Sequence, residues 1–418
     1  MRPMETLLGW HRRYGDLFTA KFLIFGTGVY VADPAEIRAL MTGDQSDLHA
    51  GEANAPLAGV LGNHSVLVLD GPEHMRQRKL LLPPFQGSAV TAFRDVIRDV
   101  AEAEVARWRP GQELVMRDRM RALTFEVICR AVFGVTEPER VERLRAAMLA
   151  AIDSGATFLL PGPLKWDLGS RSPAGRLKQR IKVADDLIYE EIARRRAEPD
   201  LEERTDVLSL LMRARDEDGS PMTDVELRDE LVTMLAAGHE TTATGLAFAF
   251  DLLLHDPPAL ERLRSELAAG DDAYLEAVVS ETLRIRPVID GAERTLKKPR
   301  TIGGWDLPPG IRVYPAILLV HHREDLYPEP HRFRPERFLN GGVESYAWLP
   351  FGGGIRRCLG MAFALYEMKI VLARLLASAD LELADGGETR PVTRGFFIAP
   401  EKGLRVRLLG RRIRRAAA

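Results

Sequence analysis

A glycine-rich loop that ends at a cysteine is the stretch of this sequence best suited to chemistry. It reads Phe351-Gly-Gly-Gly-Ile-Arg-Arg-Cys358-Leu-Gly360, and its glycines permit a close approach to a flat ligand that side chains would block. Cys358 precedes a predicted helix, and both the positive end of that helix and the neighbouring arginines favour the thiolate. A thiolate in this setting can bind a soft metal; the alternative is a structural cysteine on a turn.

The other cysteine serves as a control. Cys129 lies in an amphipathic helical pattern over residues 125–133, and we assign it to the core. Two cysteines in 418 residues exclude a disulfide framework and are typical of a protein in a reducing cytoplasm, where we expect this chain.

A carboxylate and two hydroxyls interrupt a long apolar helix. Residues 237–242 read Ala-Gly-His-Glu-Thr-Thr, and polar groups in a buried helix are costly unless they are paired or used. Gly238 is a poor helix former and a threonine hydroxyl can bond back to the preceding turn. We therefore expect a local distortion that makes room for a ligand; a satisfied polar contact between helices is the alternative.

These motifs, with two more, resemble signatures of the cytochrome P450 monooxygenases, in particular soluble bacterial members. The loop matches the haem-binding pattern of that family at Phe351, Gly354, Arg356, Cys358 and Gly360. Residues 237–242 are similar to its oxygen-activation motif. A Glu-x-x-Arg motif at residues 281–284 and a Pro-Glu-Arg-Phe element at residues 335–338 follow in the order that the family shows.

The resemblance implies a single mainly α domain over residues 1–418 with a small β-rich region, and haem b between the long helix and the cysteine loop. Cys358 would be the axial ligand of the haem iron, because thiolate donation favours cleavage of the O–O bond. Thr241 would hydrogen-bond the oxygen being activated, and Glu240 would help to relay protons to it through water.

Cationic side chains would hold the two haem propionates. Four residues stand where the family places such groups: His74, Arg78, Arg294 and Arg356. The resemblance also implies a buried network of Glu281, Arg284 and Arg337 that locks the irregular segment behind the cysteine loop, since the planar guanidinium pairs bidentately with carboxylates. By spacing alone, Glu281 and Arg284 are an ion pair on one helix face. We expect His321, His322 and His331 to be structural.

The substrate contacts implied by the resemblance are all apolar. They are Ala237, Val288, Ile289 and Phe397. The apolar loop at residues 157–166 is either a packing loop or a lid over an apolar pocket. An apolar substrate follows, such as a fatty acid, terpenoid, steroid or polyketide.

Electrons should come from a separate protein, since no flavin-binding fingerprint or room for a fused reductase is visible. We expect a ferredoxin or flavodoxin with its NAD(P)H reductase. Arg76, Lys79 and Arg357 would form a basic patch on the cysteine side that steers an acidic partner; scattered solvated charge is the alternative.

Several elements must position these groups. We predict a β-rich part at about residues 15–60 with a loop over residues 43–66, and helices over residues 90–108, 114–133, 139–152 and 176–196. The longest helix, residues 223–255, begins at a capping box of Thr223 and Glu226. An irregular stretch over residues 321–354 and a helix over residues 359–377 follow.

Composition restricts the class of protein further. The chain has 58 basic and 60 acidic residues, with 46% hydrophobic and 28% charged residues. This balance is typical of a soluble globular protein and argues against a nucleic-acid binder. The sequence contains no apolar run of the length that crosses a bilayer, so we expect no membrane span.

We therefore predict a haem-thiolate monooxygenase that inserts one atom of dioxygen into an apolar substrate by hydroxylation or epoxidation and reduces the other atom to water. A peroxide-driven or isomerising haem-thiolate enzyme is one alternative, against which Glu240 and Thr241 count because such enzymes need no proton relay. A haem-binding protein without turnover is the other.

Overall fold

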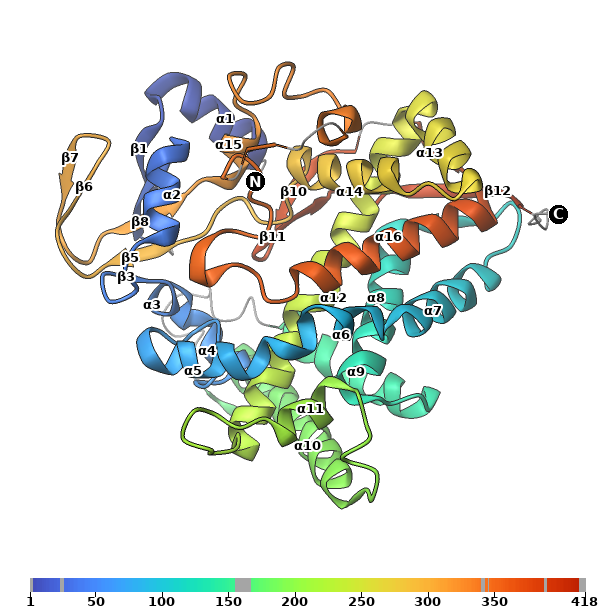
Figure 1. Ribbon diagram of the computed structural model, residues 1–418, viewed down its shortest axis with the longest axis horizontal. Helices are drawn as coiled ribbons and strands as arrows, with labels where there is room; N and C mark the ends of the chain where they lie inside the picture. The colour runs from blue at the N-terminus through green and yellow to red at the C-terminus, as the bar shows by residue number, and fades with distance from the viewer. Residues whose placement is uncertain are drawn as a thin grey trace.

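The computed structural model describes residues 3–22, 26–154, 167–339, 343–344, 346–386 and 389–412. Helices form most of this part of the chain, and strands collect mainly at one side (Figure 1). This is the single, mainly α domain with a β-rich region that was predicted. Among the described residues, no helix has both the length and the apolar character needed to cross a bilayer.

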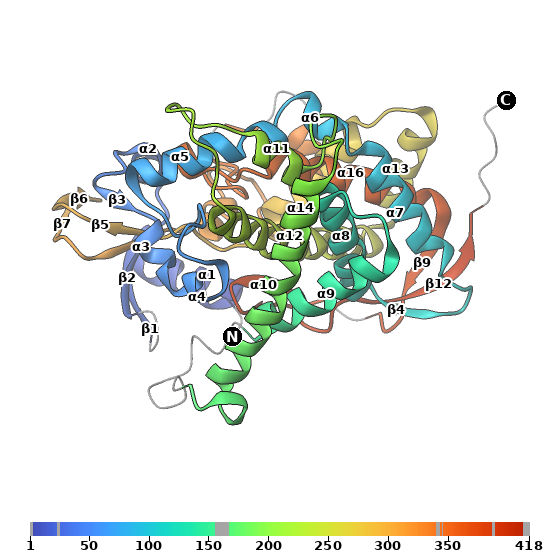
Figure 2. The same cartoon turned by 90° about the horizontal axis from the view of Figure 1, so that it is seen from below.

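The central element is α12, Asp224–His255, which runs through the middle of the molecule (Figures 1 and 2). The predicted capping box starts it: the Glu226 N–H donates to Thr223 Oγ1 at 3.2 Å, and the Thr223 N–H donates to Glu226 Oε2 at 2.7 Å. Leu231, Leu246 and Phe250 are fully buried. Because α12 is apolar on most sides, it lies in the core.

The other helices surround α12. They are α1 (Pro3–Tyr14), α2 (Pro34–Thr42), α3 (Gly51–Asn54), α4 (Ala58–Leu61), α5 (Gly71–Leu81), α6 (Ser88–Thr91), α7 (Arg94–Ala106), α8 (Met116–Phe133), α9 (Pro138–Asp153), α10 (Pro173–Ala197), α11 (Val207–Arg213), α13 (Pro257–Ala269), α14 (Ala273–Ile285), α15 (Ile317–His321) and α16 (Met361–Ser378). Of these, α8 packs along α12 and α10 projects from the body of the molecule (Figure 2).

Two of the predicted segments were wrong in detail. The expected loop at residues 43–66 contains α3 and α4, which are four residues each and too short to produce a periodic pattern. The expected helix at residues 90–108 is divided into α6 and α7. Short helices of this kind depend on tertiary contacts, because a single turn does not offset its own nucleation cost.

The strands join distant parts of the chain. The largest sheet has the order β1 (Leu17–Phe22), β2 (Gly26–Val31), β8 (Arg312–Pro315), β5 (Arg294–Leu296) and β3 (Leu48–His49). The smaller sheets are β4 (Glu113–Val115) with β12 (Arg405–Arg411) and β9 (Ala379–Leu383), β6 (Arg300–Ile302) with β7 (Trp305–Leu307), and β10 (Pro391–Arg394) with β11 (Phe397–Pro400). Within the largest sheet, β2 and β8 are parallel. Long-range pairing thus places the segment after α14 beside the N-terminal strands.

Candidate active site

The cysteine loop is held in shape by its glycines and by α2. The N–H of Cys358 donates to the carbonyl oxygen of Phe351 at 3.0 Å, which closes the loop. Gly354 opens the short 3₁₀ helix η7 (Gly354–Arg356) with φ of 61°, and a Cβ there would lie 1.8 Å from the carbonyl oxygen of Met41 in α2. Only glycine permits both this conformation and this contact.

Cys358 is an exposed residue, although many protein atoms lie around its thiol. Burial raises its pKa, while the N–H of Gly360 and the charges of Arg78 and Arg357 lower it. The positive groups that were expected to favour the thiolate are therefore present, and burial outweighs them. A Cβ on Gly360 would meet no atom within 4 Å. Open space beside this loop leaves room for a flat ligand.

One strip of α12 is reached by solvent in the middle of the core. Ala237 is exposed and Thr241 is half-buried. The two residues share a helix face, and the Thr241 Oγ1 donates to the carbonyl oxygen of Ala237 at 2.6 Å. The expected local distortion does not break α12, which is one continuous helix over Asp224–His255. The exposed strip indicates a recess beside α12.

Glu240 lies away from this strip, although it precedes Thr241 in the sequence. Successive helix residues are about 100° apart around the axis, and Glu240 is buried against α8. There it pairs with Arg117, and the Arg121 Nε lies 2.5 Å from its Oε2. Sequence reasoning missed both arginines. The sequence gives no clear signal for them, because α8 also carries Asp118, Arg119, Glu126 and Arg130.

Three arginines from three separate parts of the chain, Arg78, Arg294 and Arg356, form a cationic group near the ring of His74. His74 of α5 is buried, and its Nδ1 has no hydrogen-bond partner among the described residues. Burial, then the charges of Arg356, Arg78 and Arg294, lower its pKa to about 3. Burial also lowers the pKa of Arg294 and of Arg356 to about 10.

The carboxylate of Asp70 is the one anion that raises the pKa of either arginine. Like charges gathered in a buried place are unfavourable without an anion. The two propionates of haem would supply that anion, so these residues fit the group that the cysteine loop suggests.

Glu281, Arg284 and Arg337 meet behind this loop. Arg284 and Glu281 are both fully buried and form a bidentate pair, with Nε to Oε2 at 2.6 Å and Nη2 to Oε1 at 2.8 Å. The Arg337 Nε lies 3.4 Å from Glu281 Oε1. Arg337 belongs to the 3₁₀ helix η6 (Pro335–Phe338), so the pair holds the irregular segment against α14. His321 extends the network: its carbonyl oxygen accepts from Arg284, and its Nε2 accepts from the N–H of Leu349.

The expected substrate contacts differ in accessibility. Val288 is buried and packs in the core, whereas Ile289 is 38% exposed. Phe397 of β11 is half-buried, and the N–H of its neighbour Ile398 donates to the carbonyl oxygen of Val288 at 2.8 Å. Ala237 is exposed in the middle of α12. The apolar loop at residues 157–166 lies outside the described residues.

The expected basic patch is mostly neutralised. Arg76 pairs with Asp216 and Glu226 at 2.6 and 2.5 Å, and Lys79 pairs with Glu217 at 2.5 Å. The acids come from the segment before α12 and from its first turn, which the sequence does not place beside α5. Arg357 is exposed, and no described carboxylate pairs with it.

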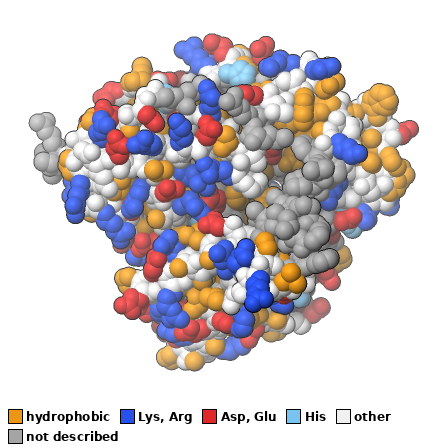
Figure 3. Space-filling view, turned by 180° about the vertical axis from the view of Figure 1, so that it is seen from behind, with side chains coloured by type: hydrophobic (Ala, Val, Ile, Leu, Met, Phe, Trp, Pro, Cys, Tyr) orange, Lys and Arg blue, Asp and Glu red, His pale blue; other side chains and the backbone are white. Residues whose placement is uncertain are grey.

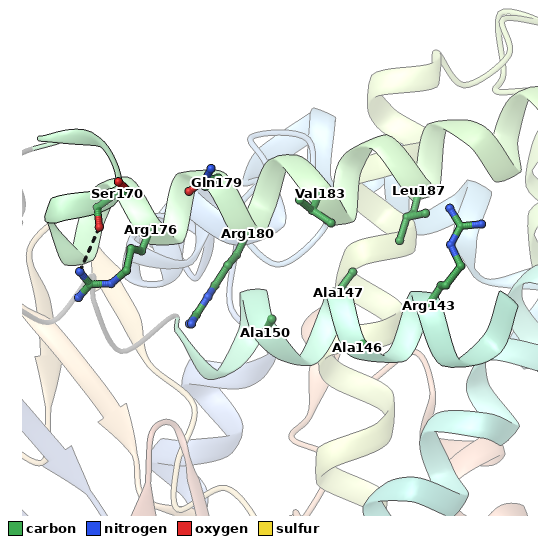
Figure 4. A pocket seen from close by; sticks show the side chains of 10 residues that line it. All are labelled: Arg143, Ala146, Ala147, Ala150, Ser170, Arg176, Gln179, Arg180, Val183 and Leu187. Carbon is green, nitrogen blue, oxygen red and sulfur yellow. Dashed lines mark hydrogen bonds between the residues drawn. The ribbon is translucent and has the colours of Figure 1, made fainter. Parts of the chain in front are cut away.

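A groove between α9 and α10 is separate from these groups (Figure 4). It has a volume of about 720 Å³. Its lining residues are Arg143, Ala146, Ala147, Ala150, Ser170, Arg176, Gln179, Arg180, Val183 and Leu187. None of them belongs to the cysteine loop, the exposed strip of α12 or the cationic group, so the groove is not the reaction site.

A cysteine on a glycine loop, a half-buried threonine on a core helix and a cationic group for an anion together fit a haem-thiolate protein. The sequence profile named cytochrome P450 matches residues 2–408. The chain belongs to the cytochrome P450 family. Enzymes of this family bind haem and are oxidoreductases that incorporate oxygen.

Individual relatives agree with this assignment. A Mycobacterium tuberculosis protein with the provisional name cytochrome P450 135B1 is 43% identical over 413 residues, which are 97% of this chain and 87% of that protein. Another from that organism, provisionally cytochrome P450 135A1, is 40% identical over 405 residues, 96% and 90% of the two chains. The solved structure of retinoic acid bound cyanobacterial CYP120A1 has a TM-score of 0.85 and 27% identity, and the match covers 96% of this chain and 93% of that one.

Proposed function

We propose that this enzyme inserts one oxygen atom of dioxygen into an apolar small molecule, by hydroxylation or epoxidation, and reduces the other atom to water. A separate ferredoxin or flavodoxin with its NAD(P)H reductase supplies the electrons. The observation that carries the proposal is the Thr241 hydroxyl on the exposed strip of α12, in a chain whose Cys358 thiol is also accessible.

The positions of the residues in the cysteine loop and in the cationic group support a role for them in holding haem. Cys358 would bind the iron, and His74, Arg78, Arg294 and Arg356 would hold the propionates. Phe351, Gly354 and Gly360 shape the loop on the side of the thiolate. When bound, haem supplies the iron at which dioxygen is activated, and thiolate ligation favours cleavage of the O–O bond.

The polar side chains of α12 handle the protons. The hydroxyl of Thr241 can rotate away from the carbonyl oxygen of Ala237 and hold a water on the exposed strip, because a hydroxyl both donates and accepts. Glu240 is the acid behind it. Its ion pairs with Arg117 and Arg121 must open before the carboxylate reaches the Thr241 side of the helix. Proton delivery is therefore coupled to a movement at the contact between α8 and α12.

The accessible side chains favour an apolar substrate. Ala237, Ile289 and Phe397 are all reached by solvent and carry no polar group. Burial of apolar surface stabilises a bound ligand by roughly 25 cal/mol per Å². The solved relative with retinoic acid bound supports a largely apolar ligand. A fatty acid, terpenoid, steroid or polyketide fits this chemistry.

The first experiment is the difference spectrum of the reduced protein with and without carbon monoxide. We expect the strongly red-shifted Soret band of thiolate-ligated haem in the wild type and in Cys129→Ala, which removes the thiol buried in α8. Cys358→Ser should lose that band. A band typical of histidine-ligated haem in the wild type, or a red-shifted band that survives in Cys358→Ser, would refute the ligand assignment.

The second experiment separates a monooxygenase from a haem protein without turnover. Apolar compounds are screened for a shift in the haem spin state, and those that produce one are incubated with a ferredoxin, its reductase, NAD(P)H and labelled dioxygen. We expect one labelled oxygen atom in the product. Product that forms only when peroxide is supplied would favour the peroxide-driven alternative.

A further inference from the structure

A strap of chain, residues 64–70, crosses from the N-terminal half of α12 to the cysteine loop. Three side chains of α12 hold its first residues. The N–H of His64 donates to Asp229 Oδ2 at 2.9 Å, and the N–H of Val66 donates to Glu230 Oε1 at 2.8 Å. The Thr233 hydroxyl donates to the hydroxyl of Ser65 at 2.7 Å. The strap is therefore fixed to α12 through its backbone.

The other side of the strap is held by Arg356 of the cysteine loop. Its Nη1 donates to the carbonyl oxygen of Val66 at 3.1 Å, and its Nη2 donates to the carbonyl oxygen of Leu69 and to Asp70 Oδ1, both at 2.5 Å. Val66 thus uses its N–H toward α12 and its carbonyl toward the cysteine loop. One residue links two elements that are far apart in the sequence.

We infer that Glu230 is a positioning residue for Arg356 and acts through the Val66 backbone to hold the guanidinium toward a haem propionate. The inference rests on the proposed role of Arg356 and adds a residue that the family motifs of this sequence do not include. Glu230 is fully buried. Among the described residues, the N–H of Val66 is the one hydrogen-bond donor to its carboxyl group.

The geometry explains why a remote acid matters. The Nε of Arg356 has no hydrogen-bond partner among the described residues, so the direction of the guanidinium depends on its three acceptors. Two of these are carbonyl oxygens of the strap. In metal sites, the residues that hydrogen-bond a ligating side chain commonly set its orientation. Losing one of them typically costs about 10- to 100-fold in affinity for the metal.

The chemistry of Glu230 predicts which replacement is tolerated. Burial raises the pKa of Glu230 well above its usual range, and the nearby Asp229 and Glu226 add to this. A glutamine amide oxygen, which carries no charge, can therefore replace the carboxyl oxygen as the acceptor. Methionine has the same length without an acceptor.

The test compares Glu230→Met, Glu230→Gln and Thr233→Val in the haem-loaded protein. The readout is the rate of haem transfer to an excess of apomyoglobin, with the haem reduction potential as a second measurement. We expect Glu230→Met to release haem about tenfold faster and to lower the potential, because a displaced cation stabilises the reduced haem less. Glu230→Gln should stay close to the wild type. Thr233→Val removes a strap contact that does not involve Val66, and it should also stay close.

A double-mutant cycle shows whether Arg356 mediates the effect. Arg356→Gln alone should release haem faster, and adding Glu230→Met should change that rate less than twofold. A full additional effect of Glu230→Met in the Arg356→Gln background would overturn the inference. Unchanged haem release in Arg356→Gln alone would instead overturn the proposed role of Arg356.

Amide hydrogen exchange of residues 62–70 gives a readout that does not depend on haem release. We expect the Val66 N–H to exchange faster in Glu230→Met than in Glu230→Gln. Equal protection in the two variants would contradict the inference. Glu230→Ala lacks the same acceptor and serves as the second variant if Glu230→Met does not accumulate.

Discussion

Ala237 and Thr241 are reached by solvent although Leu235, His239 and Glu240 of the same stretch of α12 are buried. At the scale of single residues, this local exposure marks where a ligand can meet the helix. Glu240 is adjacent in sequence but faces α8, where Arg117 and Arg121 pair with it. Two neighbouring polar residues therefore have separate surroundings, and we assign them separate steps of proton transfer.

Thr241→Ala should uncouple electron consumption from product formation. NAD(P)H oxidation continues, but the product falls at least about tenfold and hydrogen peroxide rises, because general acid catalysis commonly contributes a hundredfold or more. Thr241→Ser keeps the hydroxyl and should recover most of the product. Product and peroxide are measured against NAD(P)H consumed.

The matched control is Thr242→Val. The Thr242 hydroxyl donates to the carbonyl oxygen of Gly238 at 3.0 Å, and this residue is buried. We expect the coupling of this variant to equal that of the wild type. Loss of coupling in Thr242→Val, or full coupling in Thr241→Ala, would be at odds with the role given to Thr241.

At the scale of elements, α16 carries an acid that the site does not use. Glu367 is buried, and its Oε1 has no hydrogen-bond partner among the described residues. Burial raises its pKa well above the usual range. Above the ordinary pKa of a glutamate, the unfolded state has released the proton that the folded state still binds. This residue therefore lowers the free energy of unfolding as the pH rises.

Glu367→Gln removes this titration. The free energy of unfolding of the variant, relative to the wild type, should increase between pH 5 and pH 8, by about 1.4 kcal/mol for each pH unit of this range that lies below the folded-state pKa. Denaturant unfolding at both pH values measures it. Glu276→Gln, which alters an exposed acid paired with Lys369, is the control and should show no such trend. A constant difference for Glu367→Gln would contradict the expectation.

At the scale of the whole molecule, folding decides which charges remain available to a partner. Acidic and basic side chains are intermixed over the face in Figure 3, in keeping with the net charge of −2. Near the cysteine loop, the segment before α12 and its first turn bring acids to Arg76 and Lys79. Of the three cations in the expected basic patch, Arg357 is the one for which no described carboxylate is a partner.

Arg357→Glu should therefore weaken electron delivery from an acidic partner. We expect the Michaelis constant for a ferredoxin to rise about three- to tenfold at low salt, with a smaller salt dependence, because a charge at the rim of an interface acts mainly on association. Lys182→Glu makes the same change of charge on α10 and is the control. Equal effects of the two variants would mean that net charge, not the position of Arg357, governs the encounter.

Features that depend on local spacing were predictable from the sequence. The capping box of Thr223 and Glu226 formed as predicted, because its partners are three residues apart. The pairing of Glu281 with Arg284 follows from the same helical spacing. The glycine of the cysteine loop at residue 354 was also visible, since a left-handed conformation needs a glycine whatever lies around it.

Tertiary structure alone decided the rest. The sequence does not show that Arg117 and Arg121 face Glu240, that Val66 joins Glu230 to Arg356, or that β2 and β8 pair in one sheet. Each of these contacts joins residues more than a hundred positions apart in the sequence. Helical and strand periodicities specify which side of an element is buried, but the partner on that side depends on how all the elements pack together.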